Sequence, residues 1–242
     1  MNTILTEAEQ QRFTAEQLAL SKQITLTDSR DFSAVQTVAG VDLAYWDLPD
    51  GSEYAVCCIV VLDMQTKKVL ETVSADGKIT VPYCPGFLAF RELPLVTQAV
   101  KKLQAQPELF VFDGNGYLHP RHMGIASHAA LMLQKPAFGV AKTYYRVLDT
   151  DYREPAQTAG SFSDIVIGGA VYGRVLRTHD NVKPVFVSVG SGISLDTATD
   201  IALRMTDRES RIPLPTRLAD LETHTARTAL QNQFQQSSQE SI

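Results

Sequence analysis

The chain has 242 residues, of which 44% are hydrophobic and 20% are charged, and this balance suits a globular domain with a sizeable core. No stretch approaches the ~20 apolar residues of a membrane-spanning helix, and the N-terminus lacks the pattern of a secretory signal. The net charge of −5 argues against a surface that binds polyanions all over, but it permits a local basic groove.

Three cysteines form an odd set without the spacing of a zinc site: Cys57, Cys58 and Cys84. Cys57 and Cys58 are neighbours inside an apolar run, which indicates core thiols in a reducing compartment. We therefore expect a cytoplasmic protein that does not associate with membranes.

The chain begins with one predicted helix and three predicted strands. Residues 5–22 are helix-like, and Thr6 with Glu9 matches a capping box at the start. Three apolar segments with short linkers predict strands in an antiparallel meander: residues 37–46, 54–63 and 68–75.

Helices and strands alternate after the meander. A Pro/Gly loop opens residues 83–104 and becomes a helix, and a second helix is predicted near 122–134. Apolar runs predict strands at 108–113 and 137–142. A mixed α/β sheet follows from this order.

The connection between the third and fourth strands has a consequence for two aspartates. A helical crossover there places the fourth strand parallel to the first. If the two strands are neighbours, Asp42 and Asp113 come close together.

The C-terminal part predicts strands within 170–178 and 184–190 and a helix from Ser194. We find no repeat and no second domain, so residues 1–230 are expected to form one catalytic unit. The segment 231–242 is polar and is predicted to be a disordered tail.

Three carboxylates lie among apolar residues: Asp42, Glu92 and Asp113. One such aspartate alone is explained by a salt bridge or a turn, since an unpaired buried carboxylate costs several kcal/mol. Three of them point to a shared cation, and oxygen ligands favour Mg²⁺ or Mn²⁺ over zinc. Lys142 ends the fifth strand, where it can face the same cluster.

The stretch "FVFDGNGYLHPRHMGIASHAAL", residues 110–131, joins a strand to a helix and exposes a carboxylate beside backbone amides. His119 and His128 within it are interpreted as packing residues or as supports of a nearby site. Arg121 contacts a phosphate or pairs with an aspartate, and the sequence leaves both readings open.

These residues give the chain a family resemblance. The sequence resembles endonuclease V, the deoxyinosine 3′ endonuclease, over roughly residues 37–220. The matching segments occur in the family's order: "VAGVDLAY", "VPYCPGFLAFRE", "FVFDGNGYLHPRHMGIASH", "FGVAK", "GRVLRT", "PVFVSVG" and "RIPLPTRLAD". The resemblance implies an RNase H-like mixed sheet flanked by helices.

The resemblance also implies roles for individual residues. Asp42, Glu92 and Asp113 match the family's metal carboxylates, Lys142 matches its active-site lysine, and Asp220 falls close to the metal. A second set matches the wedge tyrosine and the pocket for the damaged base: Tyr83, then Gly86, Leu88, Gly114, Gly124 and Ile125.

The implied activity is Mg²⁺-dependent nicking of DNA at the second phosphodiester bond 3′ to deoxyinosine, with Mn²⁺ as a substitute metal. Inosine-containing DNA is therefore the expected partner. Two alternatives stay open: an inosine-specific endoribonuclease of the same family, and a protein that binds deaminated bases with little turnover.

The chain departs from the family's pattern at a few positions. Ser191 and Gly192 stand where the family usually has histidine and a basic residue, and Leu93 and Leu214 replace a glycine and a glutamate. A Ser-Gly pair carries no positive charge, so we expect a weaker hold on nucleic acid with the metal chemistry preserved.

Overall fold

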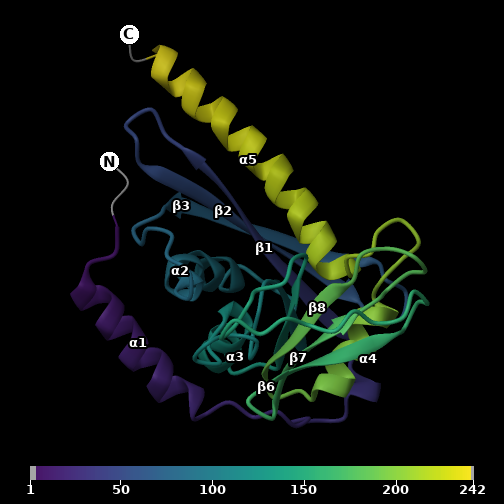
Figure 1. Ribbon diagram of the computed structural model, residues 1–242. Coiled ribbons are helices and arrows are strands. Elements are labelled where there is room, and N and C mark those ends of the chain that lie inside the picture. The colour runs from purple at the N-terminus through teal and green to yellow at the C-terminus, as the bar shows by residue number, and fades with distance from the viewer. Residues whose placement is uncertain (1–3, 241–242) are drawn as a thin grey trace.

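One mixed sheet of eight strands organises the computed structural model, which describes residues 4–240 (Figure 1). The strands lie in the order β3-β2-β1-β4-β5-β8-β7-β6. The helices are α1 (Glu7–Ser21), α2 (Leu88–Val100), α3 (Ile125–Leu133), α4 (Leu195–Arg204) and α5 (Leu214–Glu240), with a 3₁₀ turn at Phe32–Ala34. The strands are β1 (Thr37–Asp47), β2 (Glu53–Asp63), β3 (Val69–Lys78), β4 (Leu109–Asp113), β5 (Ala137–Ala141), β6 (Phe162–Ile167), β7 (Ala170–Leu176) and β8 (Val185–Ser191).

The first half of the sheet follows the predicted order. Strands β1, β2 and β3 form an antiparallel meander, and Thr6 caps α1 through the expected capping box with Glu9. After the α2 crossover, β4 pairs with β1 in parallel, and Val41 lies opposite Phe112. The next residue on each strand is an aspartate, so Asp42 and Asp113 are neighbours, as predicted.

Helices cover both faces of the sheet. Helices α2 and α3 pack on the face formed by side chains such as Ala39 and Phe110. Helices α4 and α5 pack on the opposite face, which is formed by the residues next to these in the chain, such as Val38 and Leu109. Figure 1 shows α5 running along the sheet on the side away from α2. The alternation of strand side chains therefore decides which helix each residue meets.

The C-terminal segment differs from the sequence prediction. Helix α5 continues to Glu240, so residues 231–240, predicted as a disordered tail, are helical, and residues 241–242 lie outside the described part. The ring of Phe234 meets that of Tyr54 edge-on at 5.1 Å, and Leu230 packs with Trp46. These contacts with β1 and β2 give the polar segment an apolar partner. The short strand β6 was not predicted either.

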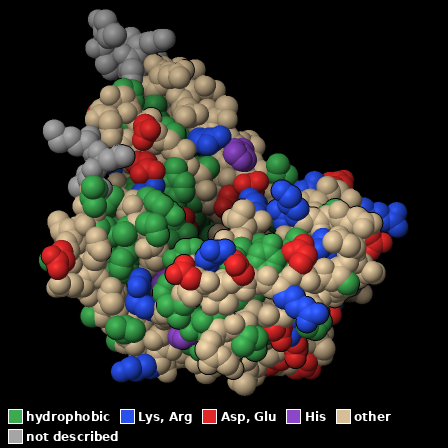
Figure 2. Space-filling model, viewed as in Figure 1, with side chains coloured by type: hydrophobic (Ala, Val, Ile, Leu, Met, Phe, Trp, Pro, Cys, Tyr) green, Lys and Arg blue, Asp and Glu red, His purple; other side chains and the backbone are tan. Residues whose placement is uncertain are grey.

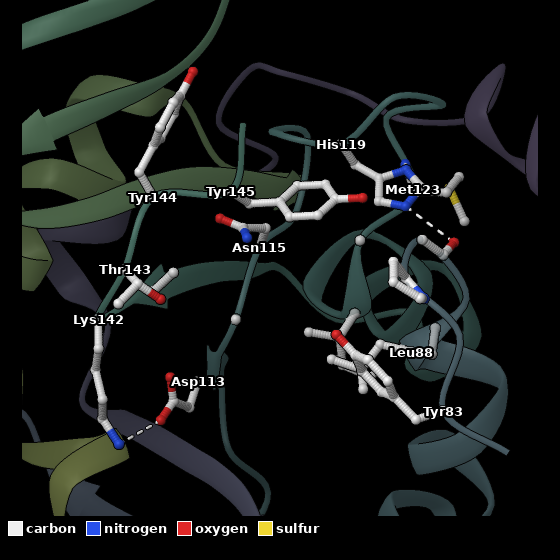
Figure 3. Close-up of a pocket in the computed structure, with 17 residues that line it drawn as sticks. Tyr83, Leu88, Asp113, Asn115, His119, Met123, Lys142, Thr143, Tyr144 and Tyr145 are labelled. Atoms are coloured by element: carbon white, nitrogen blue, oxygen red, sulfur yellow. Dashed lines mark hydrogen bonds and ion pairs between the residues drawn. The ribbon is translucent and has the colours of Figure 1, made fainter. Parts of the chain in front are cut away.

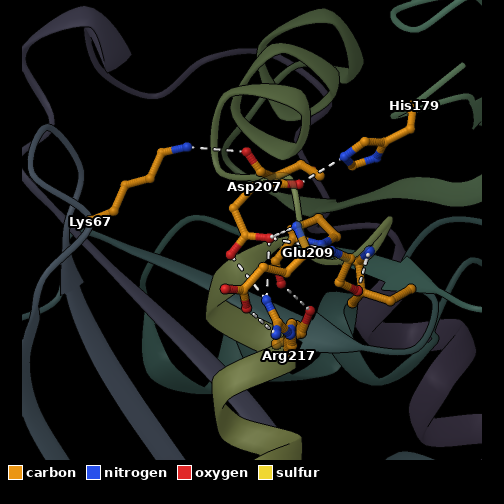
Figure 4. A network of polar contacts seen from close by, with 10 residues as sticks. Lys67, His179, Asp207, Glu209 and Arg217 are labelled. Carbon is orange, nitrogen blue, oxygen red and sulfur yellow. Dashed lines mark hydrogen bonds and ion pairs between the residues drawn. The ribbon is translucent and has the colours of Figure 1, made fainter.

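A polar network anchors the first turns of α5 (Figure 4). The Arg217 guanidinium bonds Asp207 at 3.0 Å and Glu209 at 2.6 Å. The Asp207 carbonyl oxygen lies 2.8 Å from His179 Nε2, and Lys67 donates to the Thr206 carbonyl. Although α5 has 27 residues, no helix within residues 4–240 is apolar enough over a long enough stretch to cross a membrane.

Helix α5 packs directly against β1 at Gly40, and this contact yields a prediction. A Cβ on Gly40 would lie 1.9 Å from the Pro215 carbonyl oxygen, so Gly40→Ala forces α5 away from the sheet. We expect the free energy of unfolding to fall by about 2 kcal/mol or more, measured by chemical denaturation.

Gly77→Ala is the matched control on the same sheet. Its Cβ would meet only Leu95 Cδ2, at 3.4 Å, which is ordinary contact, so the change should stay below about 1 kcal/mol. Equal stabilities for the two variants would contradict the close packing of α5 on β1.

Candidate active site

Charged side chains gather where β1, β4 and β5 meet α5. Side chains two residues apart on a strand point to the same face of the sheet. Asp42, Asp113 and Lys142 each lie two residues after a residue on the face that α5 covers, namely Gly40, Val111 and Val140. Helix α5, which covers this face of the sheet, contributes Asp220 to the group. The sequence predicted each of these residues, and the structure brings all four together.

Lys142 is the hub of this charged group. Its Nζ lies 2.7 Å from Asp113 Oδ2 and 3.5 Å from Asp220 Oδ1, and Figure 3 shows the contact with Asp113. Thr223, one turn along α5 from Asp220, donates from Oγ1 to Asp42 Oδ2 at 3.3 Å. Although partial burial opposes the charged form, the carboxylate contacts raise the pKa of Lys142, which keeps it cationic.

The group holds more negative charge than Lys142 neutralises. Burial, and next the carboxylates of Asp113 and Asp220, raise the pKa of Asp42 to about 7, against the opposing effect of Lys142. A carboxylate that is so reluctant to ionise is one that an added cation would stabilise in its charged form.

Glu92 approaches the group from α2, on the other face of the sheet. Its side chain is buried, and its Oε1 accepts a hydrogen bond from the Tyr45 hydroxyl at 2.5 Å. Burial raises the pKa of Glu92 to about 7 despite that hydrogen bond, and the charge of Asp42 adds to the increase. Tyr45 was not among the predicted site residues, although it lies in the same "VDLAY" segment as Asp42.

The donor chemistry of this site fits a hard divalent cation, because Asp42, Glu92, Asp113 and Asp220 offer only carboxylate oxygens. As the side chains stand, no three His, Cys, Asp or Glu residues within residues 4–240 are grouped to hold a metal ion. The Lys142 ammonium instead bonds both Asp113 and Asp220. A metal therefore stays a prediction.

A pocket of about 350 Å³ opens beside the charged group. Figure 2 shows a hollow in the visible face, with hydrophobic side chains gathered on one side and charged ones on the other. In Figure 3, Lys142 and Asp113 lie at one side, and Tyr83 and Leu88 lie at the other. All residues predicted for the base pocket line it: Tyr83, Gly86, Leu88, Gly114, Gly124 and Ile125.

Backbone forms much of the pocket wall. Gly86 and Gly114 have φ of +84° and +146°, which other residues rarely adopt. A Cβ on Gly114 would lie 2.8 Å from Ile125 Cγ2. Glycine at these positions therefore lets main-chain groups, rather than side chains, face a ligand.

Several pocket residues were not predicted from the sequence: Pro85, Ala89, Asn115, His119, Met123, Ala141, Thr143, Tyr144 and Tyr145. Thr143, Tyr144 and Tyr145 directly follow the lysine of "FGVAK", a position that could have pointed to them. His119 had been interpreted only as a packing or supporting residue.

His119 is a neutral part of the wall. Burial, and next the Arg121 guanidinium, lower the pKa of His119 to about 4. Its Nδ1 accepts from the backbone N–H groups of Arg121 and Met123. The proton is therefore on Nε2, which donates to the Gly86 carbonyl oxygen at 3.1 Å.

Ser191 and Gly192 lie away from this pocket. Ser191 pairs with Ala137 at the start of β5, whereas Lys142 follows the end of that strand. Ser191 is buried, and its Oγ accepts from the Thr25 backbone N–H at 3.0 Å. Ser191 and Gly192 therefore pack against residues 25–29. This position does not support the expectation that they weaken the binding of nucleic acid.

The other departures and His128 also have packing roles. Leu93 is buried in the α2 core, and Leu214 packs against the core at the start of α5. His128 is buried on α3, with its ring edge-on to Phe90 at 5.1 Å. Burial lowers the pKa of His128 to about 4, as expected for a packed histidine.

This mixed sheet of eight strands, with carboxylates on adjacent strands and helices on both faces, is an RNase H-like fold. The family model for Endonuclease V matches residues 18–221. The chain belongs to the endonuclease V family.

Individual relatives agree with this assignment. The Endonuclease V of Bacillus thuringiensis subsp. konkukian is 54% identical over 220 residues, which cover 91% of this chain and 93% of the relative. The crystal structure of the Bacillus subtilis Endonuclease V superposes with a TM-score of 0.89 at 48% identity, covering 96% and 97% of the two chains. The Ciona intestinalis Endonuclease V was solved with a 24mer DNA containing an inosine followed by a ribo-adenosine. It superposes with a TM-score of 0.83 at 27% identity, covering 93% of this chain and 100% of the Ciona chain.

Tyr45 gives a prediction about Glu92. Tyr45→Phe removes the hydrogen bond that orients this buried carboxylate, and bonds to charged groups contribute about 1.5–3 kcal/mol. We expect nuclease activity to fall by roughly tenfold or more while circular dichroism still shows a folded protein.

The matched control is Tyr54→Phe on the adjacent strand, whose hydroxyl bonds the exposed Asp76. It should retain activity within about twofold, because a surface hydrogen bond of this kind contributes little. If both variants cleave equally well, Tyr45 does not orient Glu92 for the reaction.

Proposed function

We propose that this chain is a magnesium-dependent DNA repair endonuclease, a deoxyribonuclease V that acts on deoxyinosine. It nicks the second phosphodiester bond 3′ to the lesion and leaves 3′-hydroxyl and 5′-phosphate ends. We place this activity in the cytoplasm, consistent with three cysteines that are all free thiols.

One observation carries the proposal. Asp113 and Lys142, from the charged group, line the same pocket as the glycine-rich walls and the Tyr83 loop. Its volume of about 350 Å³ lies at the small end of the range for small-molecule sites, ~300–1,000 Å³. A single extruded base, rather than a paired one, suits such a pocket, and its backbone would then lie beside the charged group.

The pocket walls suggest how the base is read. Hypoxanthine is guanine without the exocyclic amine, so a closely fitted wall accepts hypoxanthine and excludes guanine by shape. The main-chain groups around Gly114 and Gly124 supply hydrogen bonds to its edge. Extruding a deaminated base costs less than extruding a well-paired one, which adds selectivity.

Tyr83 is placed to stabilise the opened duplex. It is 68% exposed at the rim of the pocket, and Pro82 and Pro85 on either side restrict the loop. An aromatic ring on a stiff loop can fill the gap that an extruded base leaves in the stack.

The charged group is placed to assist phosphodiester hydrolysis. Bound Mg²⁺, held by Asp42, Glu92, Asp113 and Asp220, would make the attacking water more acidic and stabilise the leaving oxyanion. Lys142 stays cationic beside Asp113, so it can offset negative charge that develops on the phosphate. Mn²⁺ is expected to substitute, because it accepts the same oxygen ligands.

RNA is a second candidate substrate. The Ciona complex contains a ribo-adenosine directly after the inosine, so a relative binds an oligonucleotide that carries a 2′-hydroxyl. An inosine-specific endoribonuclease is therefore the alternative that we test beside the DNA activity.

A nicking assay tests the proposed function. The purified full-length chain should nick a duplex with one deoxyinosine when Mg²⁺ is present, and should not nick it with excess EDTA. The same sequence with deoxyadenosine is the substrate control, and RNA and a strand with one ribo-adenosine measure sugar preference. Product sizing identifies the bond that is cut.

Asp113→Asn is the protein control for this assay. The amide keeps the shape of the carboxylate without its charge, so we expect a folded variant slower by on the order of 100-fold or more. Nicking that survives EDTA would rule out the metal. Inosine-specific binding without any nicking by the wild type would favour the alternative of a binding protein.

Tyr83 gives a separate prediction. Tyr83→Ala removes stacking worth about 1–3 kcal/mol, so the preference for binding inosine-containing over normal duplex should fall by roughly 5- to 150-fold. Tyr83→Phe keeps the ring and should retain the preference. Fluorescence anisotropy with the two duplexes measures it, and an unchanged ratio in the Ala variant would return Tyr83 to an ordinary surface residue.

A further inference from the structure

A buried glutamine of α1 contacts the residues that form the pocket walls, although it does not itself line the pocket. Gln17 has an exposed fraction of 0%, which is unusual for a polar side chain unless its hydrogen bonds are satisfied. It lies just before the matched range 18–221. None of its polar atoms faces solvent, so each partner can be identified.

The Gln17 amide bridges two walls of the pocket. Its Nε2 donates to the Gly86 carbonyl oxygen at 2.9 Å and to the Met123 carbonyl oxygen at 3.2 Å. Gly86 belongs to the wall that precedes α2, and Met123 belongs to the wall that precedes α3. One NH₂ group therefore uses its two hydrogens to tie one wall to the other.

Arg121 completes the link. Its Nε donates to Gln17 Oε1 at 2.5 Å, and its Nη2 donates to the Gly86 carbonyl oxygen at 2.9 Å. His119 donates to the same carbonyl. Three side chains thus converge on Gly86, which holds its left-handed backbone in one place. Neither a phosphate contact nor an aspartate pair is needed to explain Arg121.

Helix α1 itself is fixed by apolar contacts that do not involve Gln17. The Phe13 ring stacks on Phe90 with centroids 3.9 Å apart, and it contacts Phe87 at 5.9 Å. Loss of the Gln17 hydrogen bonds therefore leaves α1 docked and affects mainly the spacing of the two walls.

We infer that Gln17 is a positioning residue that sets the width of the base pocket and thereby its rejection of guanine. The inference rests on the proposed function, because it takes the pocket to hold an extruded purine. Hypoxanthine and guanine differ by one exocyclic amine. A wall that moves outward by a fraction of an ångström therefore makes room for that amine and improves the binding of guanine, but not that of hypoxanthine. A general loss of stability would slow cleavage at both bases alike.

The test compares two variants with a control on the same helix. Gln17→Met removes every hydrogen bond of the side chain at similar volume. Gln17→Glu keeps the acceptor for Arg121 but replaces both donors by a carboxylate oxygen, so it breaks the bridge and repels the Gly86 and Met123 carbonyl oxygens. Gln11→Met is the control, since Gln11 is exposed and bonds only Glu7 within α1.

Each protein is assayed in single turnover on duplexes with deoxyinosine or deoxyguanosine opposite thymine, so that both purines are mispaired. Both Gln17 variants should lose at least about tenfold in inosine-over-guanosine selectivity. The bound-state rate on inosine should stay within about threefold of the wild type, and Gln11→Met should match the wild type in both. Melting temperatures should stay within about 5 °C of the wild type.

The outcomes are separable. If the wild type shows no inosine-specific nicking, the proposed function is wrong, and the inference about Gln17 is wrong with it. A wild type that nicks inosine, with Gln17 variants of unchanged selectivity, overturns the inference alone. Variants that lose both activities equally, or that no longer fold, also overturn it, because Gln17 would then maintain overall stability rather than pocket width.

Discussion

Two aspartates lie side by side because β1 and β4 pair in parallel, and the repulsion between their carboxylates is the constraint on which the site is built. Burial and this neighbour raise the pKa of Asp42. Lys142 offsets part of the charge by bonding Asp113. The remaining excess of negative charge, presented by oxygen donors alone, is the physical reason to expect a divalent cation there.

Helix α5 completes the charged group, so its placement matters as much as the sheet. Contact between Pro215 and Gly40 sets its distance from β1, and the Arg217 network anchors its first turns. Asp220 follows one turn later and reaches Lys142. The far end of the helix packs on the β1–β2 hairpin through Phe234. A long helix held at several points along its length can place one carboxylate reproducibly.

The pocket depends on segments that are distant in the chain. Walls that precede α2 and α3 are joined by Gln17 from α1, across 69 residues to Gly86 and 106 residues to Met123. Because the charged group and the pocket share Asp113 and Lys142, the base recognition and the hydrolysis that we propose would be coupled by geometry. If the Gln17 inference holds, a change in wall spacing affects which base is accepted before it affects the chemistry.

The sequence alone determined every strand except β6, the α1 cap and the parallel direction of β1 and β4, because periodicity, capping and crossover rules act locally. The family motifs added six of the residues that line the pocket, but not others such as His119 and Tyr145. Only the tertiary structure decided that Tyr45 holds Glu92, that α5 continues through the polar C-terminal segment, and that Gln17 joins the pocket walls. Those features rest on packing between segments that are far apart in the chain, and no local pattern encodes which distant partner a polar side chain meets.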